Sequence, residues 1–168
     1  TLEAIVNSAA WEVGDLAVLR LLSRDGAWLD AVAGKHRDPT RDQGVHDIMQ
    51  GDRHAADQGV TGDALRTGHA IRLTAADVAA RKRADPRLWP ATPQMPSEVL
   101  LAAPLRLEGR GIGTLSVSRE TTNHPYTIED ERFLQDLADR AALAIERARL
   151  FDCVRTNEAR LTTLVEQL

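Results

Sequence analysis

The sequence predicts a single mixed domain of the α/β (α+β) class, built on antiparallel strands with a helix at each end. Three observations predict this class. Segments 16–33 and 99–119 each look like two strands joined by a tight turn. Apolar residues recur at helical spacing in segment 1–13 and again from residue 127 onward. The length of 168 residues suits one domain with one hydrophobic core.

The first quarter of the chain predicts a helix followed by a hairpin. The helix ends near Gly14, a plausible stop, and its apolar positions are Leu2, Ile5, Val6, Ala9 and Val13. Residues 16–23 are rich in Leu and Val and predict a strand. Residues 24–26, Arg-Asp-Gly, have the chemistry of a turn, and 28–33 predict the return strand.

The middle of the chain is less regular. Residues 35–59 are polar, contain three histidines, and predict loops around one short helix. Thr61 is the expected N-cap and Gly68 the expected stop of the next helix. Three elements are predicted here, a helix at 61–67, a strand at 70–74 and a helix at 75–84. Asp85-Pro86 breaks the second helix. A long surface loop is predicted after it, because four prolines lie close together at Pro86, Pro90, Pro93 and Pro96.

The last part predicts a second hairpin and a long exit helix. The hairpin has strands at 99–107 and 112–119 around a turn at 108–111. Thr127 begins the helix, with Asp130 in the third helical position of a capping box. Neither Gly nor Pro follows, which allows a helix of roughly 42 residues, about 63 Å at 1.5 Å per residue. Its second half must therefore project from the domain or pair with another helix.

Composition excludes several classes of protein. Hydrophobic residues make up 43% and charged residues 27%, which is typical of a folded globular domain. The net charge of −4 argues against a nucleic-acid binder, and no apolar run approaches the ~20 residues of a membrane span. Cys153 is the only cysteine, so an intrachain disulfide and a multi-cysteine metal site are excluded. We expect a cytoplasmic setting, no nucleic-acid partner and no contact of this segment with a membrane.

The order of elements and several short motifs resemble the GAF family of sensory domains. Segment 59–72, which contains Gly59, Gly62 and Gly68, resembles a glycine-containing segment of the family. Four further segments follow in the family's order. Two resemble strands of the family: 97–105, which ends in a Pro-Leu pair, and 111–117, which contains Gly-Ile-Gly-Thr-Leu. The other two resemble the entry to the last helix, at 126–130, and the Ala-rich exit helix, at 137–148. The resemblance covers residues 1 to about 152, and we assign 1–152 to the sensory domain and 153–168 to a signalling helix.

This resemblance implies a fold and a function. The fold is a central antiparallel sheet with the N- and C-terminal helices on one face. The other face carries a lid of loops and helices over a small-molecule cavity. The implied function is a regulatory, non-enzymatic sensor in a bacterial signalling protein, either a histidine kinase or a cyclic-di-GMP enzyme. Its implied partners are an unidentified small molecule, a second copy through the terminal helices, and a downstream PAS or output domain in the same chain.

The terminal helices support this interpretation. The chain opens at Thr1 inside one helical pattern and closes at Leu168 inside another, so we interpret it as part of a longer protein. A 3-4 spacing typical of a coiled coil is kept by Leu161, Leu164, Val165 and Leu168. Residues 157–166 also resemble the helix that leads into a PAS domain. A ligand-free structural dimerisation module is the alternative to a sensor.

Candidate ligand-binding residues come from the lid, for which we take residues 35–59 and 75–98, and from the aromatic and Met side chains near it. They are Trp28, His46, Met49, Trp89 and Met95. We expect no cofactor and no metal. The His and Asp residues between 46 and 57 could bind a divalent metal, but a solvated polar loop is the preferred interpretation. The basic run 81–83 with Arg87 is interpreted as a solvated helix end.

Other members of the family suggest three further alternatives, and none is favoured. A bilin would need a cysteine in the domain body, whereas Cys153 lies in the exit helix. The free methionine sulfoxide reductases of this fold also depend on cysteines within the domain. Cyclic-nucleotide members carry Asn-Lys/Arg and then Phe-x-x-x-Asp-Glu; here Ser118 replaces the Asn and Tyr126 the Phe. We expect Arg119 instead to form an ion pair with Asp130 or Glu131, bridging the last strand and the exit helix.

Overall fold

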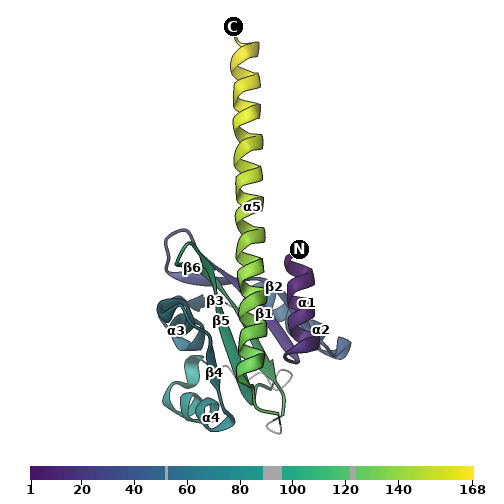
Figure 1. Cartoon of the computed structure of the whole chain (residues 1–168), viewed down its shortest axis with the longest axis vertical. Helices are drawn as coiled ribbons and strands as arrows, with labels where there is room; N and C mark the ends of the chain where they lie inside the picture. The colour runs from purple at the N-terminus through teal and green to yellow at the C-terminus, as the bar shows by residue number, and fades with distance from the viewer. Residues whose placement is uncertain (52, 89–95, 122–123) are drawn as a thin grey trace.

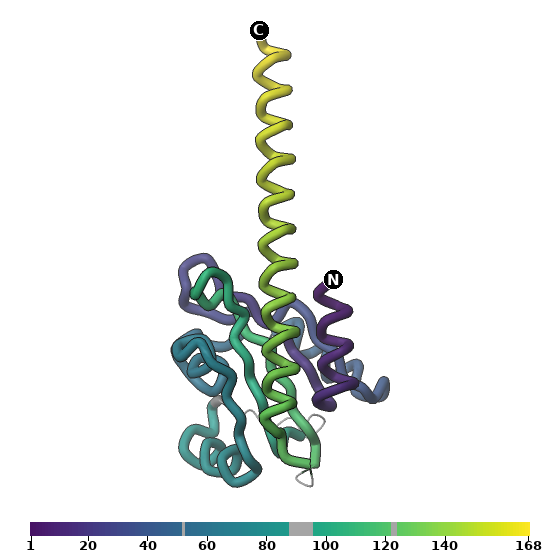
Figure 2. Tube along the Cα trace, viewed as in Figure 1, coloured from purple at the N-terminus to yellow at the C-terminus, as the bar shows by residue number. Residues whose placement is uncertain are grey.

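A computed structural model describes residues 1–51, 53–88, 96–121 and 124–168, and its centre is an antiparallel sheet (Figures 1 and 2). The strands lie in the order β3-β2-β1-β6-β5-β4. Their bounds are Leu16–Leu22 for β1, Trp28–His36 for β2, Arg53–Ala55 for β3, Ile71–Leu73 for β4, Val99–Leu107 for β5 and Arg110–Arg119 for β6. The two predicted hairpins are therefore β1–β2 and β5–β6, and β1 and β6 pair at the centre of the sheet.

Helices cover both faces of this sheet. The α-helices are α1 (Leu2–Glu12), α2 (Asp42–Gly51), α3 (Gly59–Thr67), α4 (Ala75–Ala84) and α5 (Ile128–Glu166). Two short 3-10 turns, η1 and η2, lie at Pro39–Arg41 and Pro86–Leu88. In Figure 1 the first and last helices lie side by side against the sheet. The predicted fold class is confirmed.

One face of the sheet, which we call the helical face, packs against α1 and α5. In the central strand pair, Leu19 lies opposite Leu115 and Ala17 opposite Val117. All four belong to the main buried core, with α1 residues such as Val6 and α5 residues that extend to Ile145. Because successive side chains of a strand point to opposite faces, the residues between them must face the other side of the sheet.

The other face is covered by α2 and α3. Gly34 of β2 lets α2 come close, since a Cβ there would lie 3.2 Å from Val45 Cγ1 and 3.4 Å from Met49 Sδ. Gly111 of β6 likewise lets α3 come close, since a Cβ on Gly111 would lie 2.7 Å from Leu65 Cδ1. Helices thus cover the face opposite α1 and α5, as the family resemblance implied.

The structure also corrects several local predictions. The return strand runs to His36 rather than ending at Ala33, because its second half pairs with β1 beyond a bulge. Strand β3, at 53–55, lay in the segment predicted as loops and one short helix. Thr61 lies inside α3 and is not its N-cap; Gln58 occupies that position without a side-chain cap. Part of the predicted proline-rich loop, 89–95, lies outside the described residues.

Helix α5 leaves the domain after its last core contact. Thr127 caps it, and the predicted capping box with Asp130 is present. Its buried residues end at Ile145, and the exposed apolar side chains that follow are Leu150, Phe151, Val154, Leu161, Leu164, Val165 and Leu168. Figure 1 shows this second half projecting well beyond the sheet.

Candidate functional site: the polar face of the sheet

Three hydroxyl side chains lie in a row on central strand β6. Thr114, Ser116 and Ser118 alternate with apolar residues of the helical face, so they point toward the side covered by α2 and α3. Thr114 is fully buried and Ser118 is 6% exposed. Buried polar groups at the centre of a sheet are uncommon and need a physical reason. We call this side of the sheet the polar face.

Arg20 adds a charge to the polar face. It lies opposite Thr114 in the sheet and is only 4% exposed. Its Nη1 is 3.5 Å from Ser116 Oγ, and its Nη2 is 3.5 Å from His54 Nε2 of edge strand β3. A guanidinium stays protonated at any physiological pH, so a permanent positive charge lies within this face.

The Thr114 hydroxyl has no hydrogen-bond partner among the described residues, although its oxygen is buried. The neighbouring hydroxyls have partners: Ser116 Oγ donates to the Val18 carbonyl at 3.4 Å, and Ser97 Oγ donates to Ser118 Oγ at 3.2 Å. An unsatisfied buried hydroxyl costs about 1–3 kcal/mol. A ligand that hydrogen-bonded to Thr114 would recover part of this cost.

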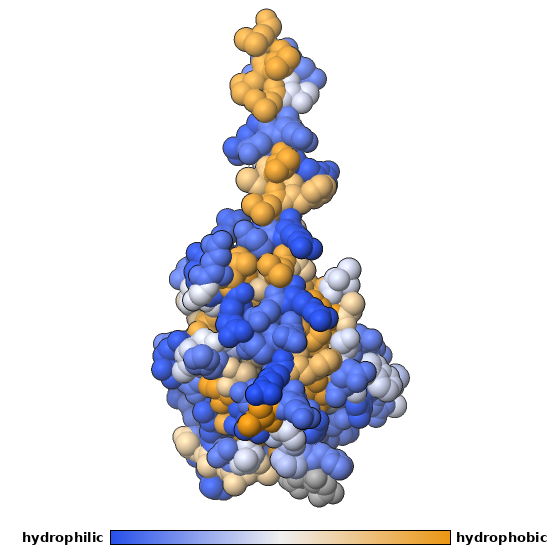
Figure 3. Space-filling view, viewed as in Figure 1, coloured by the Kyte–Doolittle hydropathy of each residue, from blue (hydrophilic) through white to orange (hydrophobic). Residues whose placement is uncertain are grey.

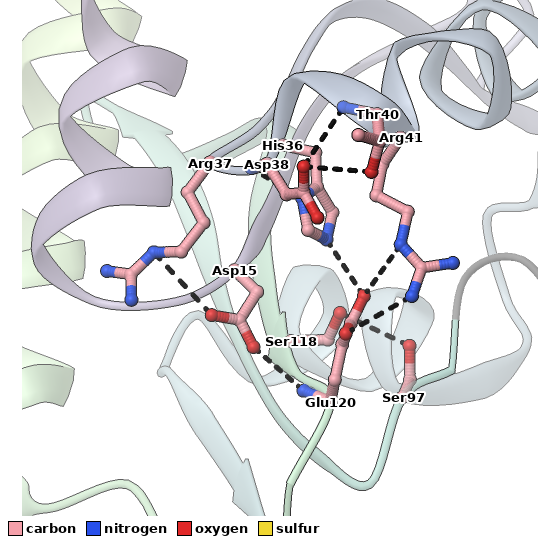
Figure 4. A network of polar contacts seen from close by, with 9 residues as sticks. All are labelled: Asp15, His36, Arg37, Asp38, Thr40, Arg41, Ser97, Ser118 and Glu120. Atoms are coloured by element: carbon pink, nitrogen blue, oxygen red, sulfur yellow. Dashed lines mark hydrogen bonds and ion pairs between the residues drawn. The ribbon is translucent and has the colours of Figure 1, made fainter.

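A polar network lies where β2 and β6 end, next to the start of α2 (Figure 4). Its centre is His36, which is buried, 3% exposed, and 3.1 Å from Glu120 Oε1 through Nε2. The amide of Asp38 donates to His36 Nδ1 at 2.9 Å. Since an amide can only donate, Nδ1 is an acceptor and the ring proton lies on Nε2, where it is donated to Glu120. Arg41 of η1 approaches the same carboxylate, with its Nε 3.4 Å from Oε1.

The network continues to the first helix. The backbone amide of Glu120 donates to Asp15 Oδ2 at 2.9 Å, and Asp15 also pairs with Arg37 at 3.6 Å. Arg37 in turn donates to the carbonyl of Trp11 in α1 at 2.6 Å. The segment that leads into α2 is therefore connected through side chains to β6 and to the end of α1.

The structure brings few of the predicted ligand-binding residues to the polar face. Met49 of α2 packs over Gly34, on that face. His46 is exposed on α2. Trp28 lies on β2 with its ring 5.0 Å from the Arg53 guanidinium, one residue before Leu29, which pairs with His54. Trp28 therefore points to the opposite side of the sheet from His54. Trp89 and Met95 lie outside the described residues.

The residues that build the polar face were not among the predicted ligand-binding residues. Arg20, Thr114, Ser116 and Ser118 occupy positions of strands that were correctly placed. The signal was available, because in segment 114–118 hydroxyl residues alternate with Leu and Val. Alternation of this kind ordinarily means that one face of a strand is in water. Only the tertiary structure shows that β6 is central and that both of its faces are covered.

The expected bridge between the last strand and the exit helix is present. Arg119 Nη2 lies 3.7 Å from Asp130 Oδ2, and its guanidinium stacks 4.2 Å from the ring centroid of Tyr126. Arg119 also donates to the His124 carbonyl at 2.7 Å. The residues that partly match the cyclic-nucleotide motif therefore hold the turn into α5.

Other candidate sites are less developed. A cavity of about 370 Å³ lies between β4 and the start of α5 and is lined by Arg72, Leu73, Thr74, Pro125, Tyr126 and Glu131. In the described ranges, no three His, Cys, Asp or Glu side chains gather as a metal site would need. No helix in those ranges combines the length and apolarity needed to cross a bilayer.

Comparison with known proteins decides the family. A family profile described as GAF domain matches residues 1–146, most of the chain. The chain belongs to the GAF domain family. The match covers the sheet, the helices on both its faces and the part of α5 that contributes to the core. It supports a regulatory, sensory role in general terms.

Solved structures show the same fold at low sequence identity. The second GAF domain of DevS from Mycobacterium smegmatis superposes with a TM-score of 0.66 at 16% identity, over 90% of this chain and 95% of that one. The GAF domain of an Acinetobacter phosphoenolpyruvate-protein phosphotransferase gives 0.67 at 17% identity, over 89% and 82%. A type II free methionine-R-sulfoxide reductase from Thermoplasma acidophilum gives 0.63 at 14% identity, over 87% and 90%. The fold is thus shared by GAF domains of signalling proteins and by an enzyme.

Proposed function

We propose that this GAF domain is a small-molecule sensor of a bacterial signalling protein, a histidine kinase or a cyclic-di-GMP enzyme, and that it relays ligand binding through a dimeric exit helix. The observation that carries the proposal is the polar face, where Thr114 holds a buried hydroxyl without a described partner. Arg20 and Ser116 lie beside it. A purely structural domain gains stability from apolar side chains at such positions, whereas a binding site needs a few placed polar groups.

The contacts of the structure offer a route from the ligand to the output. A ligand on the polar face would contact the side of the sheet that α2 and α3 cover. The His36–Glu120 network joins the segment entering α2 to the end of β6 and, through Arg37, to α1. From β6, Arg119 connects to the first turn of α5. A ligand changes the helix arrangement only by binding one arrangement better, typically by about 1–3 kcal/mol.

The enzyme alternative has little support from the chain itself. The similar methionine sulfoxide reductase shows that the fold can carry catalysis. In this chain the only cysteine, Cys153, is exposed on α5 beyond the last core residue, Ile145. We therefore propose a regulatory domain without cysteine-based activity of its own.

A ligand-free dimerisation module is the second candidate, and one observation favours it. The projecting half of α5 exposes six large apolar side chains, and Leu168 just after it adds a seventh; pairing through these side chains would not require a ligand on the polar face. The two candidates make the same prediction for dimerisation and opposite predictions for binding. Ligand binding is therefore the property that separates them.

The test is a thermal-unfolding screen of the intact chain against nucleotides, amino acids and small carboxylic acids, with Thr114→Val as the matched variant. Valine has nearly the shape of threonine and replaces the hydroxyl with a methyl group. Without ligand, we expect Thr114→Val to be as stable as the native chain or more stable. A sensing ligand should raise the unfolding temperature of the native chain and have a smaller effect on the variant. The exposed Thr162→Val serves as the control.

One result would contradict the polar face as the binding site, and another would contradict the sensor itself. If a compound stabilises the native chain and Thr114→Val equally, its binding site is elsewhere. If no compound class stabilises the native chain, while the chain is a dimer in solution, the dimerisation module is the better account.

A further inference from the structure

A continuous line of side chains with alternating steps of four and three residues begins on α5 just before Ile145 and follows the projecting half to Leu168, just past the end of the helix. Its apolar members are all exposed: Leu143, Leu150, Val154, Leu161, Leu164 and Leu168. The two remaining positions of the same line hold Arg147 and Asn157. The average step of 3.5 residues is the period at which two helices stay in contact in a left-handed coiled coil.

Figure 3 shows two apolar groups on the projecting helix, separated by a polar band. In heptad terms, Leu143, Leu150, Asn157 and Leu164 take the d positions, and Arg147, Val154, Leu161 and Leu168 take the a positions. Asn157 is therefore a polar residue within an otherwise apolar seam, with Val154 before it and Leu161 after it. A polar residue at one core position costs stability and in return selects register and partner.

We propose that α5 pairs with the α5 of a second copy as a parallel, in-register coiled coil, in which the two Asn157 side chains meet and set the register. This inference rests on the dimer of the proposed function and adds its orientation, its register and the residue that selects them.

The position of Asn157 argues for this arrangement over the others. A shift by one heptad would place Asn157 against Leu150 or Leu164. In an antiparallel pair, d residues pack against a residues, so Asn157 would meet an apolar residue or Arg147. Each of these arrangements buries an amide without a partner, which is unfavourable. In the parallel, in-register pair, one amide can donate to the other, since Asn has both a donor and an acceptor.

The charged layer is also compatible with this arrangement. Arg147 occupies an a position, and Glu146 directly before it takes the g position. In a parallel pair, the g residue lies beside the partner's following a residue, so each Arg147 would lie next to a carboxylate of the other copy. Its long aliphatic stem can cover the seam while the guanidinium stays in water.

Cysteine crosslinking of the intact chain tests the register. With Cys153→Ser as the background, Leu150→Cys and Leu164→Cys each place one thiol in a d layer, and Ala159→Cys places one on the outer f position. Under mild oxidation we expect rapid disulfide-linked dimers from the two d variants, and at least a tenfold slower reaction from Ala159→Cys. A chain that is dimeric by light scattering but crosslinks no faster at the d positions would overturn the proposal.

The role of Asn157 is tested by Asn157→Leu in the Leu164→Cys background, with the exposed Asn7→Leu as the control. Leucine should tighten association and also permit other registers or larger assemblies, so the mass distribution broadens and the yield of Leu164→Cys dimers falls. An unchanged mass and an unchanged crosslinking yield would show that Asn157 does not set the register. If the native chain is monomeric at all concentrations, the dimeric relay of the proposed function fails as well. If the native chain is dimeric but the d-position cysteines crosslink no faster than Ala159→Cys, only this inference fails.

Discussion

Tyr126, the only tyrosine of the chain, shows how much a single buried hydroxyl can matter. Its side chain is 6% exposed, and its Oη has no hydrogen-bond partner among the described residues. The position that a Cβ on Gly14 would occupy is 2.7 Å from this oxygen, so glycine leaves the room that the phenol takes. The ring face is covered by the Arg119 guanidinium. The ring therefore contributes packing, while the hydroxyl contributes a desolvation cost.

Tyr126→Phe should consequently leave the domain as stable as before, or more stable by about 1 kcal/mol, since it removes an unsatisfied buried group. Tyr126→Ala should cost about 3–5 kcal/mol, because it leaves a cavity and removes the ring on which the Arg119 guanidinium stacks. Urea denaturation followed by Trp fluorescence measures both changes. A loss above about 1 kcal/mol for Tyr126→Phe would mean that the hydroxyl has a partner that stabilises the fold.

The ionisation of Tyr126 gives a pH prediction. Burial raises its pKa well above the ordinary value, since the charged phenolate is poorly solvated in the core. The native state thus holds its proton more tightly than the unfolded state does. The corresponding stability is fully present below pH about 10, the usual tyrosine pKa, and is lost as the pH rises above it. Phenolate absorbance should appear only together with alkaline unfolding; phenolate formation near pH 10 in the folded chain would contradict this.

At the scale of elements, helix ends were the most predictable features. Thr127 and Asp130 form the expected capping box, because the hydroxyl and carboxylate each satisfy a free amide of the first turn. The bounds of α4 and β5 match the prediction as well, since turn residues or prolines flank them. Strand β3 was missed because a three-residue edge strand is too short for a recognisable period. Thr61 was wrongly expected to cap α3, because nothing local shows that the helix begins two residues earlier.

Thr127→Ala should destabilise the domain by about 1 kcal/mol, a typical cost of losing an N-cap. The matched control is Thr163→Ala on the projecting half of α5, whose hydroxyl bonds only the Ala159 carbonyl of its own helix. The control should change stability by less than about 0.5 kcal/mol, and chemical denaturation compares the two. Equal effects would mean that the start of α5 frays in the native domain and contributes little.

The site illustrates what sequence patterns leave out. The family resemblance implied a ligand cavity on the side of the sheet that carries the polar face, and the predicted lining residues came from the lid and its surroundings. Trp28 lies instead beside Arg53 on the other side of its strand, and His46 is exposed. Arg20 and Thr114 meet on the polar face only because β1 and β6 pair at the centre of the sheet. Their neighbours in space are separated from them by about ninety residues of sequence, a distance over which local periodicity carries no information.

At the scale of the whole molecule, the domain separates into a packed body and a projecting rod. The core ends at Ile145, and α5 continues to Glu166 with its apolar side chains exposed. Exposed apolar stripes of this size usually mark an interaction surface. In our proposal, the body binds a ligand on the polar face, and the rod pairs with the rod of a second copy. A relay between them requires that the rod be dimeric.

Small-angle X-ray scattering of the chain, with and without residues 151–168, tests this requirement most directly. The shortened chain keeps every core residue of α5, so its body should remain folded. We expect the intact chain to have the mass and elongated shape of a dimer and the shortened chain to have the mass of a monomer. If both are monomers, the coiled-coil relay is contradicted, and the function would have to reside in the polar face alone.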